Sequence, residues 1–281
     1  MIQPDEAERQ VSPVTDLYVA DHPMKRGADA WDVPVVVLVH GWACDSSDWA
    51  ELVPPLQDHA RVITLDLPGH GRSAEHPPYD LSSMASDVEA ALDRLGVREA
   101  MLIGHSAGAE VVAQLALTRA DLAARVVVVD PAYGVPDDER GQLELVAERM
   151  RVEDPRAVVA DRIASIPEPA ALAARHRRLA LSSRPDVVVE MFEKFNLSEG
   201  NWHYESEARR VLRALRAPVL AIYRNERRGA IGRTLTSGPS DRVLVHPGGH
   251  WPHQERPQSF LRDLNEWVVS TAASPKEGSH S

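Results

Sequence analysis

A serine lies between two glycines in the segment Gly-His-Ser-Ala-Gly, residues 104–108. An apolar run precedes it, and small and apolar residues that predict a helix begin at Ala107. A Gly-x-Ser-x-Gly segment between a strand and a helix is typical of a turn too tight for neighbouring side chains, which pushes the serine hydroxyl out above the strand end. We therefore predict that Ser106 is a nucleophile. The alternative, a turn that only joins strand to helix, is less favoured because both flanking elements are present.

A serine hydroxyl is a poor nucleophile until a base takes its proton, so a histidine must come from elsewhere in the chain. The candidate is His250, in a loop just past the last predicted strand. With His246 and His253 it forms a His-x-x-x-His-x-x-His spacing that could hold a metal ion if a helix brought the rings together. Two glycines and two prolines in residues 246–252 disfavour a helix. We therefore expect no metal or cofactor, with His246 at a strand end and His253 solvated on the loop.

These residues need elements to position them, and short Val-rich runs alternate along the chain with longer segments of helical period. This alternation is typical of an α/β fold with a buried, mostly parallel sheet. Apolar positions recur with helical spacing within residues 84–95 and 260–268, so both segments should pack on the sheet as helices. The predicted strands are residues 34–40, 61–67, 100–104, 125–130, 218–223 and 243–246.

The alternation stops between about residues 133 and 204, where helical patterns follow one another with no strand between them. We interpret residues 135–204 as a helical insertion on an α/β core formed by residues 13–134 and 205–272. Residues 1–12 and the polar tail 273–281 are expected to be disordered. The helical patterns of the insertion cover residues 143–150, 157–166, 170–181 and 185–195.

At this point the chain resembles the α/β-hydrolase family over nearly its whole length. Besides the serine turn and His250, the landmarks are His-Gly-Trp at 40–42 and Asp-Leu-Pro-Gly-His-Gly-Arg-Ser at 66–73, each after a predicted strand. The resemblance implies an eight-stranded, mostly parallel sheet flanked by helices, with a helical cap inserted between strands six and seven. It also implies an oxyanion hole built from the backbone N–H groups of Trp42 and Ala107.

The acid that orients the histidine departs from the family's common pattern. Many relatives carry an aspartate after strand seven, but this chain has Tyr-Arg-Asn-Glu at 223–226. A second placement in the family is the end of strand six, where Asp130 follows four valines. An ionised carboxylate at a buried strand end needs a partner, and an imidazole N–H would supply it. We favour Asp130; Glu226, or a pair without any acid, are the alternatives left open.

The predicted reaction is attack of Ser106 on a carbonyl group with His250 as general base, followed by hydrolysis of the acyl-enzyme by water. The substrate is expected to be a carboxylic ester or lactone, or a thioester, of medium size and hydrophobic character. A serine nucleophile argues against the dehalogenases and epoxide hydrolases of the family, which use aspartate. The expected lining of the substrate cleft is aromatic or soft: Tyr133, Met191, Phe192, Phe195, Trp202 and Trp251, with Trp42 and Tyr204 beside them.

Other activities on the same scaffold compete with this prediction. Cofactor-free dioxygenases share the strand-six acid and the Gly-Trp segment, but they carry histidines where this chain has Ala107 and the dipeptide 44–45, Cys-Asp. Carbon–carbon bond hydrolases and thioesterases use the same residue types. A non-catalytic receptor for a small ligand is disfavoured because the candidate nucleophile, base and acid are all present.

Charge and composition restrict the partners. The 281 residues contain 31 Lys and Arg against 42 Asp and Glu, a net charge of −11, with no long basic block. We therefore expect a small-molecule substrate and neither nucleic acid nor a membrane as partner. The single cysteine, Cys44, cannot form an internal disulfide, and the N-terminus is polar, which together favour a cytoplasmic location. The oligomeric state is left open.

Overall fold

The computed structural model describes residues 9–10, 17–27, 29–236 and 238–272. Its centre is one eight-stranded sheet of order β1-β2-β4-β3-β5-β6-β7-β8. The pairs β1/β2 and β2/β4 are antiparallel, and every other pair is parallel. The strands are β1 Arg9–Gln10, β2 Val19–His22, β3 Val35–Val39, β4 Arg61–Leu65, β5 Ala100–His105, β6 Ala123–Val129, β7 Val219–Tyr223 and β8 Arg242–Val245.

The six predicted strands correspond to β3–β8, which confirms the α/β fold expected from the apolar runs and the eight-stranded, mostly parallel sheet implied by the resemblance. Alternate residues of β3 enter the cores on the two faces of the sheet, so a continuous apolar run is what a strand buried on both sides requires. The short antiparallel strands β1 and β2 have no such run and were not predicted. Part of the N-terminal segment expected to be disordered thus forms β1; the rest of it, and the tail 273–281, lie outside the described residues.

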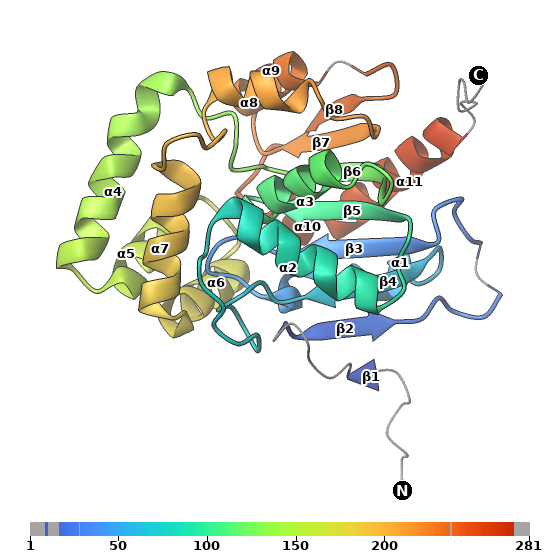
Figure 1. Ribbon diagram of the computed structural model, residues 1–281, viewed down its shortest axis with the longest axis horizontal. Coiled ribbons are helices and arrows are strands. Elements are labelled where there is room, and N and C mark those ends of the chain that lie inside the picture. Colours follow the sequence, from blue (N-terminus) through green and yellow to red (C-terminus); the bar gives the residue numbers. More distant parts are fainter. Residues whose placement is uncertain (1–8, 11–16, 28, 237, 273–281) are drawn as a thin grey trace, which may run out of the picture.

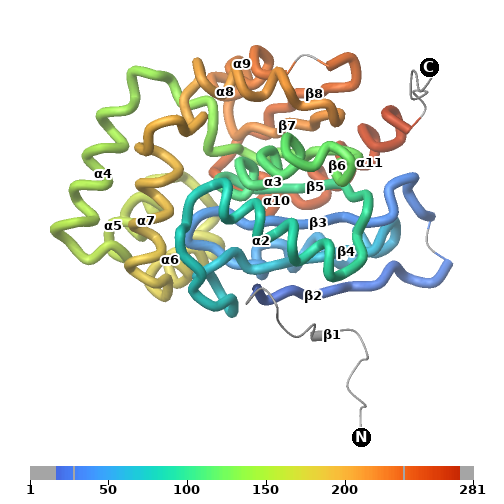
Figure 2. The backbone as a smooth tube through the Cα atoms, viewed as in Figure 1, coloured from blue at the N-terminus to red at the C-terminus, as the bar shows by residue number. Residues whose placement is uncertain are grey.

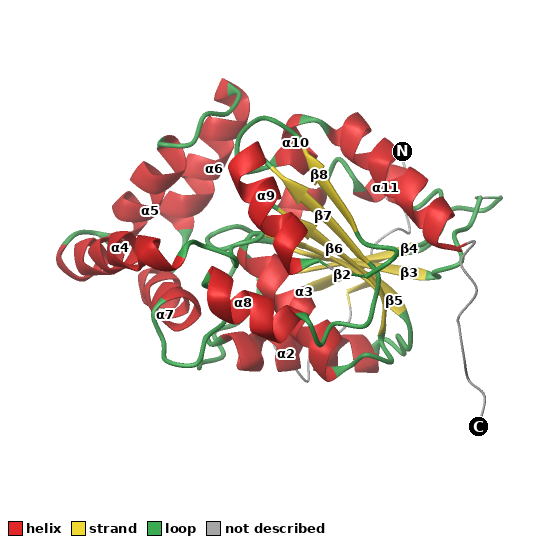
Figure 3. Cartoon of the chain, turned by 90° about the horizontal axis from the view of Figure 1, so that it is seen from above, coloured by secondary structure: helices red, strands yellow, loops and turns green. Residues whose placement is uncertain are grey.

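Helices cover both faces of the sheet (Figure 3). The face packed by α2, α3 and α8 holds the larger core, and α11 closes the opposite face together with α1. The predicted helical patterns at residues 84–95 and 260–268 lie in α2 and α11. The helices of this part are α1 Val53–Leu56, α2 Leu81–Arg94, α3 Ala107–Thr118, α8 Glu205–Leu212, α9 Glu226–Leu235, α10 Pro252–Glu255 and α11 Pro257–Ala272.

Four consecutive helices lie beyond the ends of the parallel strands (Figure 1). The chain leaves the sheet after β6, forms these helices and returns through α8 to β7, as Figure 2 traces. The four helices, here called the cap, share an apolar cluster with Ala43 and Trp251 of the loops below them. The insertion between strands six and seven therefore places a helical layer over the carboxyl ends of the strands. The cap helices are α4 Arg140–Val152, α5 Pro155–Ala164, α6 Ala170–Ser182 and α7 Pro185–Asn196.

The described helices include none that is both long and apolar enough to cross a membrane.

Candidate active site

Ser106 occupies the turn between β5 and α3 with a strained backbone. Its φ is +52° and its ψ is −118°, a conformation that residues with a Cβ rarely adopt. The turn is held from the neighbouring strand, because the Ser106 N–H donates to the Val129 carbonyl at 3.0 Å and its carbonyl accepts the N–H of Ala132 at 3.1 Å. These bonds fix the position of the serine above the carboxyl end of β5.

The two glycines that flank the serine allow β5, β3 and α3 to approach one another closely. A Cβ at Gly104 would overlap the carbonyl group of Gly108, and a Cβ at Gly108 would overlap the carbonyl oxygens of Val39 and His40. Because the obstructing atoms are backbone, they cannot turn aside as a side chain would. The glycine spacing seen in the sequence is thus a packing requirement of the turn.

Asp130 and His250 meet beside this turn. Asp130 directly follows β6 with a φ of +40°, and its Oδ2 lies 2.5 Å from Nδ1 of His250, in the loop after β8. The Asp130 side chain is 3% exposed and that of His250 18%. The other carboxylate oxygen, Oδ1, accepts the backbone N–H of Arg224 at 3.2 Å. An aspartate so held keeps Nδ1 protonated and leaves Nε2 free to accept a proton.

The surroundings favour an ionised aspartate and a neutral imidazole. Burial alone would raise the pKa of Asp130, but the hydrogen bond and charge of His250, with the charges of Arg224 and Arg228, bring that pKa below its ordinary value. Burial lowers the pKa of His250, and the bond to Asp130 opposes this effect only in part. The ring is therefore neutral near pH 7, the state in which a histidine accepts a proton.

Arg224 is the residue that sequence reasoning missed at this point. It follows β7, and its Nη1 lies 3.2 Å from Asp130 Oδ2 and 3.2 Å from His250 Nδ1. The guanidinium thus adds a positive charge to the pair. The sequence shows that no aspartate follows this strand directly, but the contact of Arg224 with Asp130 depends on the pairing of β6 with β7.

The alternative acid, Glu226, lies elsewhere. It begins α9, its side chain is 71% exposed, and its carboxylate pairs with Arg233. The structure therefore places Asp130, and not Glu226, against His250.

The two residues expected to supply the N–H groups of an oxyanion hole line the same cavity as Ser106. Ala107 is the first residue of α3, so its N–H has no acceptor within the helix. Trp42 lies in the loop after β3, and its indole Nε1 donates to the Val188 carbonyl of α7 at 2.9 Å. That bond ties the loop to the cap. Both residues line the cavity above the serine.

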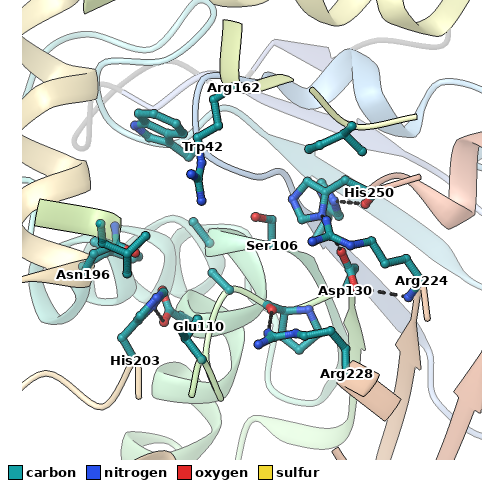
Figure 4. A pocket seen from close by; sticks show the side chains of 18 of the residues that line it. Trp42, Ser106, Glu110, Asp130, Arg162, Asn196, His203, Arg224, Arg228 and His250 are labelled. Carbon is teal, nitrogen blue, oxygen red and sulfur yellow. Dashed lines mark hydrogen bonds and ion pairs between the residues drawn. The ribbon is translucent and has the colours of Figure 1, made fainter. Parts of the chain in front are cut away.

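A cavity of about 400 Å³ lies between the cap and the strand ends, and Ser106, Asp130 and His250 line it together (Figure 4). Four of the six predicted substrate-cleft residues also line it: Met191, Phe192, Phe195 and Trp251. Tyr133 and Trp202 do not. Their rings pack against each other with centroids 5.3 Å apart in the core cluster, and the Trp202 indole points to Gln114. Their aromatic area stabilises the fold beside the cavity.

Much of the cavity lining is polar, and the sequence analysis did not predict these polar residues. Glu110 of α3 and His203 are buried, and Glu110 Oε1 lies 3.0 Å from His203 Nδ1. Arg228 donates to the carbonyls of Pro131, Tyr133 and Gly134 and so braces the turn after Asp130. A glutamate among the buried residues at the start of the largely apolar helix α3 was the available signal for the first pair. The remaining polar lining includes Glu139, Arg162, Asn196, Arg224, Asn225 and Arg227.

The other two histidines of the loop have separate surroundings. His246 follows β8, and its Nε2 lies 2.7 Å from Oδ2 of Asp263 in α11. The expectation that His253 is solvated is wrong: its side chain is fully buried, with ring centroids 4.4 Å from Trp49 and 4.9 Å from His105. The short helix α10 turns this ring inward. Over the described ranges, no three His, Cys, Asp or Glu side chains gather as metal ligands would.

The fold agrees with the comparison to known families. The alpha/beta hydrolase fold family matches residues 34–223, which is more than half of the chain. The protein therefore belongs to the alpha/beta hydrolase fold family.

Individual relatives are distant. The chain is 25% identical over 265 residues to the sn-1-specific diacylglycerol lipase of Mus musculus, covering 84% of this chain and 81% of that protein. A stretch of 113 residues is 38% identical to the magnesium-chelatase 30 kDa subunit of Rhodobacter capsulatus, of which it spans 37%. The chain thus spans well under half of that relative.

Solved structures share the fold over nearly the whole chain. The enol-lactonase of Burkholderia xenovorans superposes with a TM-score of 0.73 at 23% identity, covering 91% of this chain and 97% of its own. A thermophilic esterase of Thermogutta terrifontis gives 0.73 at 24% identity, covering 93% and 98%. At sequence identities of 23% and 24%, these likenesses show the fold alone.

Proposed function

We propose that the protein is a serine hydrolase that cleaves a carboxylic ester or lactone through an acyl-enzyme, with Ser106 as nucleophile, His250 as base and Asp130 as the orienting acid. The observation that carries the proposal is the hydrogen bond between Asp130 and His250 on the cavity into which the strained serine turn opens. The names of the esterase and the enol-lactonase with the same fold support it.

In the first half of the reaction, Ser106 Oγ bonds to the carbonyl carbon while Nε2 of His250 takes its proton. The Ser106 side chain makes no capping hydrogen bond to α3, so rotation about the Cα–Cβ bond can bring Oγ to the ring when substrate binds. The carbonyl oxygen becomes an oxyanion that accepts hydrogen bonds from the backbone N–H groups of Trp42 and Ala107. As the C–O bond breaks, His250 returns the proton to the leaving alcohol oxygen.

In the second half, a water molecule attacks the acyl carbon. His250 accepts one of its protons and passes it to Ser106 Oγ as the acyl–serine bond breaks, releasing a carboxylic acid. Esters and lactones suit this scheme because their alcohols leave more readily than amines. A cavity of about 400 Å³ with an apolar wall from α7 fits a small molecule of medium size.

Labelling with a fluorophosphonate tests the proposed nucleophile. We expect one adduct, located at Ser106 by peptide mass spectrometry and lost in Ser106→Ala. The matched control is Ser165→Ala, because Ser165 also lines the cavity but lies outside the serine turn. A panel of aryl esters, lactones and acyl thioesters then defines the bond that is cleaved. An adduct absent from Ser106, or retained in Ser106→Ala, would overturn the proposal.

A further inference from the structure

One positive charge in the cavity has no partner. Arg162, near the end of the cap helix α5, points into the cavity between Trp42 and Ser106 (Figure 4). Within the described ranges its guanidinium forms no ion pair and no hydrogen bond, and the groups that act on it are the more distant charges of Arg224 and Glu139. An arginine in a cavity wall, beside a reacting centre and without a counter-charge, is a group able to bind an anion.

The other charged residues of the lining are already engaged. Arg224 lies against Asp130, Arg227 pairs with Glu139 at 2.5 Å, and Glu110 faces His203. Arg228 donates to three backbone carbonyls. Arg162 is therefore the arginine of this lining whose guanidinium contacts neither a carboxylate nor a carbonyl group.

A second guanidinium on the same cavity repels the charge of Arg162. The Arg162 side chain is exposed at the cavity, so solvent reaches it. The neighbouring charge of Arg224 still disfavours its charged form, and Glu139 offsets this repulsion only in part. Two guanidinium groups on one cavity repel each other, and a bound anion would relieve that repulsion. An anion bound at Arg162 would therefore meet a favourable charge.

We propose that Arg162 binds a carboxylate carried by the substrate, so that the preferred substrates are monoanionic esters or lactones. The inference rests on the proposed function and narrows its substrate class. A planar guanidinium matches a carboxylate with two parallel hydrogen bonds, and a single unpaired arginine balances one negative charge. The apolar side chains of α7 would then contact the carbon chain between the carboxylate and the scissile bond.

The test compares two substrates that differ only in charge: the mono-para-nitrophenyl ester of glutaric acid and its methyl ester at the free carboxyl. For the wild-type protein we expect kcat/KM to favour the anionic substrate by about 10-fold or more. Arg162→Gln should bring this ratio close to unity, and Arg162→Lys should retain part of it. Arg156→Gln, on the same helix but outside the lining, is the control for net charge and should keep the wild-type ratio.

The outcomes separate the two proposals. Hydrolysis of both esters without a preference, or a preference that Arg162→Gln leaves intact, overturns the anion site while the hydrolase stands. If neither ester is cleaved, calorimetry on Ser106→Ala compares monomethyl glutarate with dimethyl glutarate. If monomethyl glutarate binds more tightly than dimethyl glutarate, and adding Arg162→Gln removes this difference, the anion site is supported even without hydrolysis. Equal binding of the two compounds overturns the anion site.

Discussion

Asp130 and His250 lie 120 residues apart in the chain, yet a hydrogen bond joins their side chains, with 2.5 Å between Oδ2 and Nδ1. The aspartate comes directly after β6 and the histidine from the loop after β8, and β7 lies between these strands in the sheet. The whole cap intervenes between them in sequence. The parallel order of the strands, rather than any local motif, therefore brings the acid to the base.

Replacing Asp130 with Asn should lower kcat by about 10³–10⁴-fold, because an amide can hold the imidazole in the wrong tautomer and cannot stabilise its positive form. The measurement is steady-state hydrolysis of an aryl ester. Glu226→Gln is the matched control and should remain near wild type, since Glu226 pairs with Arg233 away from the histidine. The reverse pattern would move the acid assignment to Glu226.

The pH dependence of kcat/KM should show an acidic limb set by His250. The ring accepts a proton only while neutral, so activity is present above its pKa and is lost as the pH falls through it. Because burial lowers that pKa, the midpoint of the limb should lie below the ordinary value of 6.5. Rates measured between pH 4 and pH 8 test this expectation; a midpoint above 6.5 would contradict it.

Arg224→Gln should move this acidic limb to higher pH. The guanidinium of Arg224 disfavours the charged form of His250, so its removal raises the pKa of the ring. Arg224→Lys keeps a positive charge and should leave the midpoint closer to that of the wild type. A limb unmoved by Arg224→Gln would show that the arginine has no electrostatic effect on the base.

His105 should act as a positioning residue. Its buried Nε2–H donates to the carbonyl of His250 at 2.8 Å and thereby holds the loop. His105→Phe keeps an aromatic ring but leaves this carbonyl unpaired, which should cost about 1–3 kcal/mol of unfolding free energy and lower kcat more than it raises KM. His105→Gln retains a donor and should recover part of kcat. Loss of stability with unchanged kcat would indicate a structural role alone.

Gly108→Ala should destabilise the fold by about 1–3 kcal/mol or more, since the added methyl group overlaps the backbone carbonyls of Val39, the last residue of β3, and of His40. Urea unfolding followed by circular dichroism measures the effect. The control is Gly141→Ala in α4, where a Cβ meets no atom within 4 Å. There we expect a gain of about 0.4–1 kcal/mol, because alanine loses less conformational entropy than glycine in a helix. Equal effects at both positions would contradict the packing argument.

Local pattern was sufficient for the strands and for the serine turn. A strand buried on both faces must be apolar throughout, as β3 to β7 nearly are. The serine turn leaves room only for glycine at positions 104 and 108. The short strands β1 and β2 escaped prediction because they have no long apolar run to mark them. Periodicity also located the cap helices, since each buries one apolar face.

The charges around the site depended on how distant segments pack. Pattern alone could not choose between Asp130 and Glu226, because the choice depends on which strand end faces the loop of His250. Nor did it show that Arg162 and Arg224 line the cavity, or that His253 packs against His105. Tyr133 and Trp202 were expected in the cavity lining, but they pack on each other in the core. A side chain's residue type sets its possible chemistry, but its neighbours come from elements far away in the chain. Those neighbours decide its charge state and whether it faces the cavity or the core.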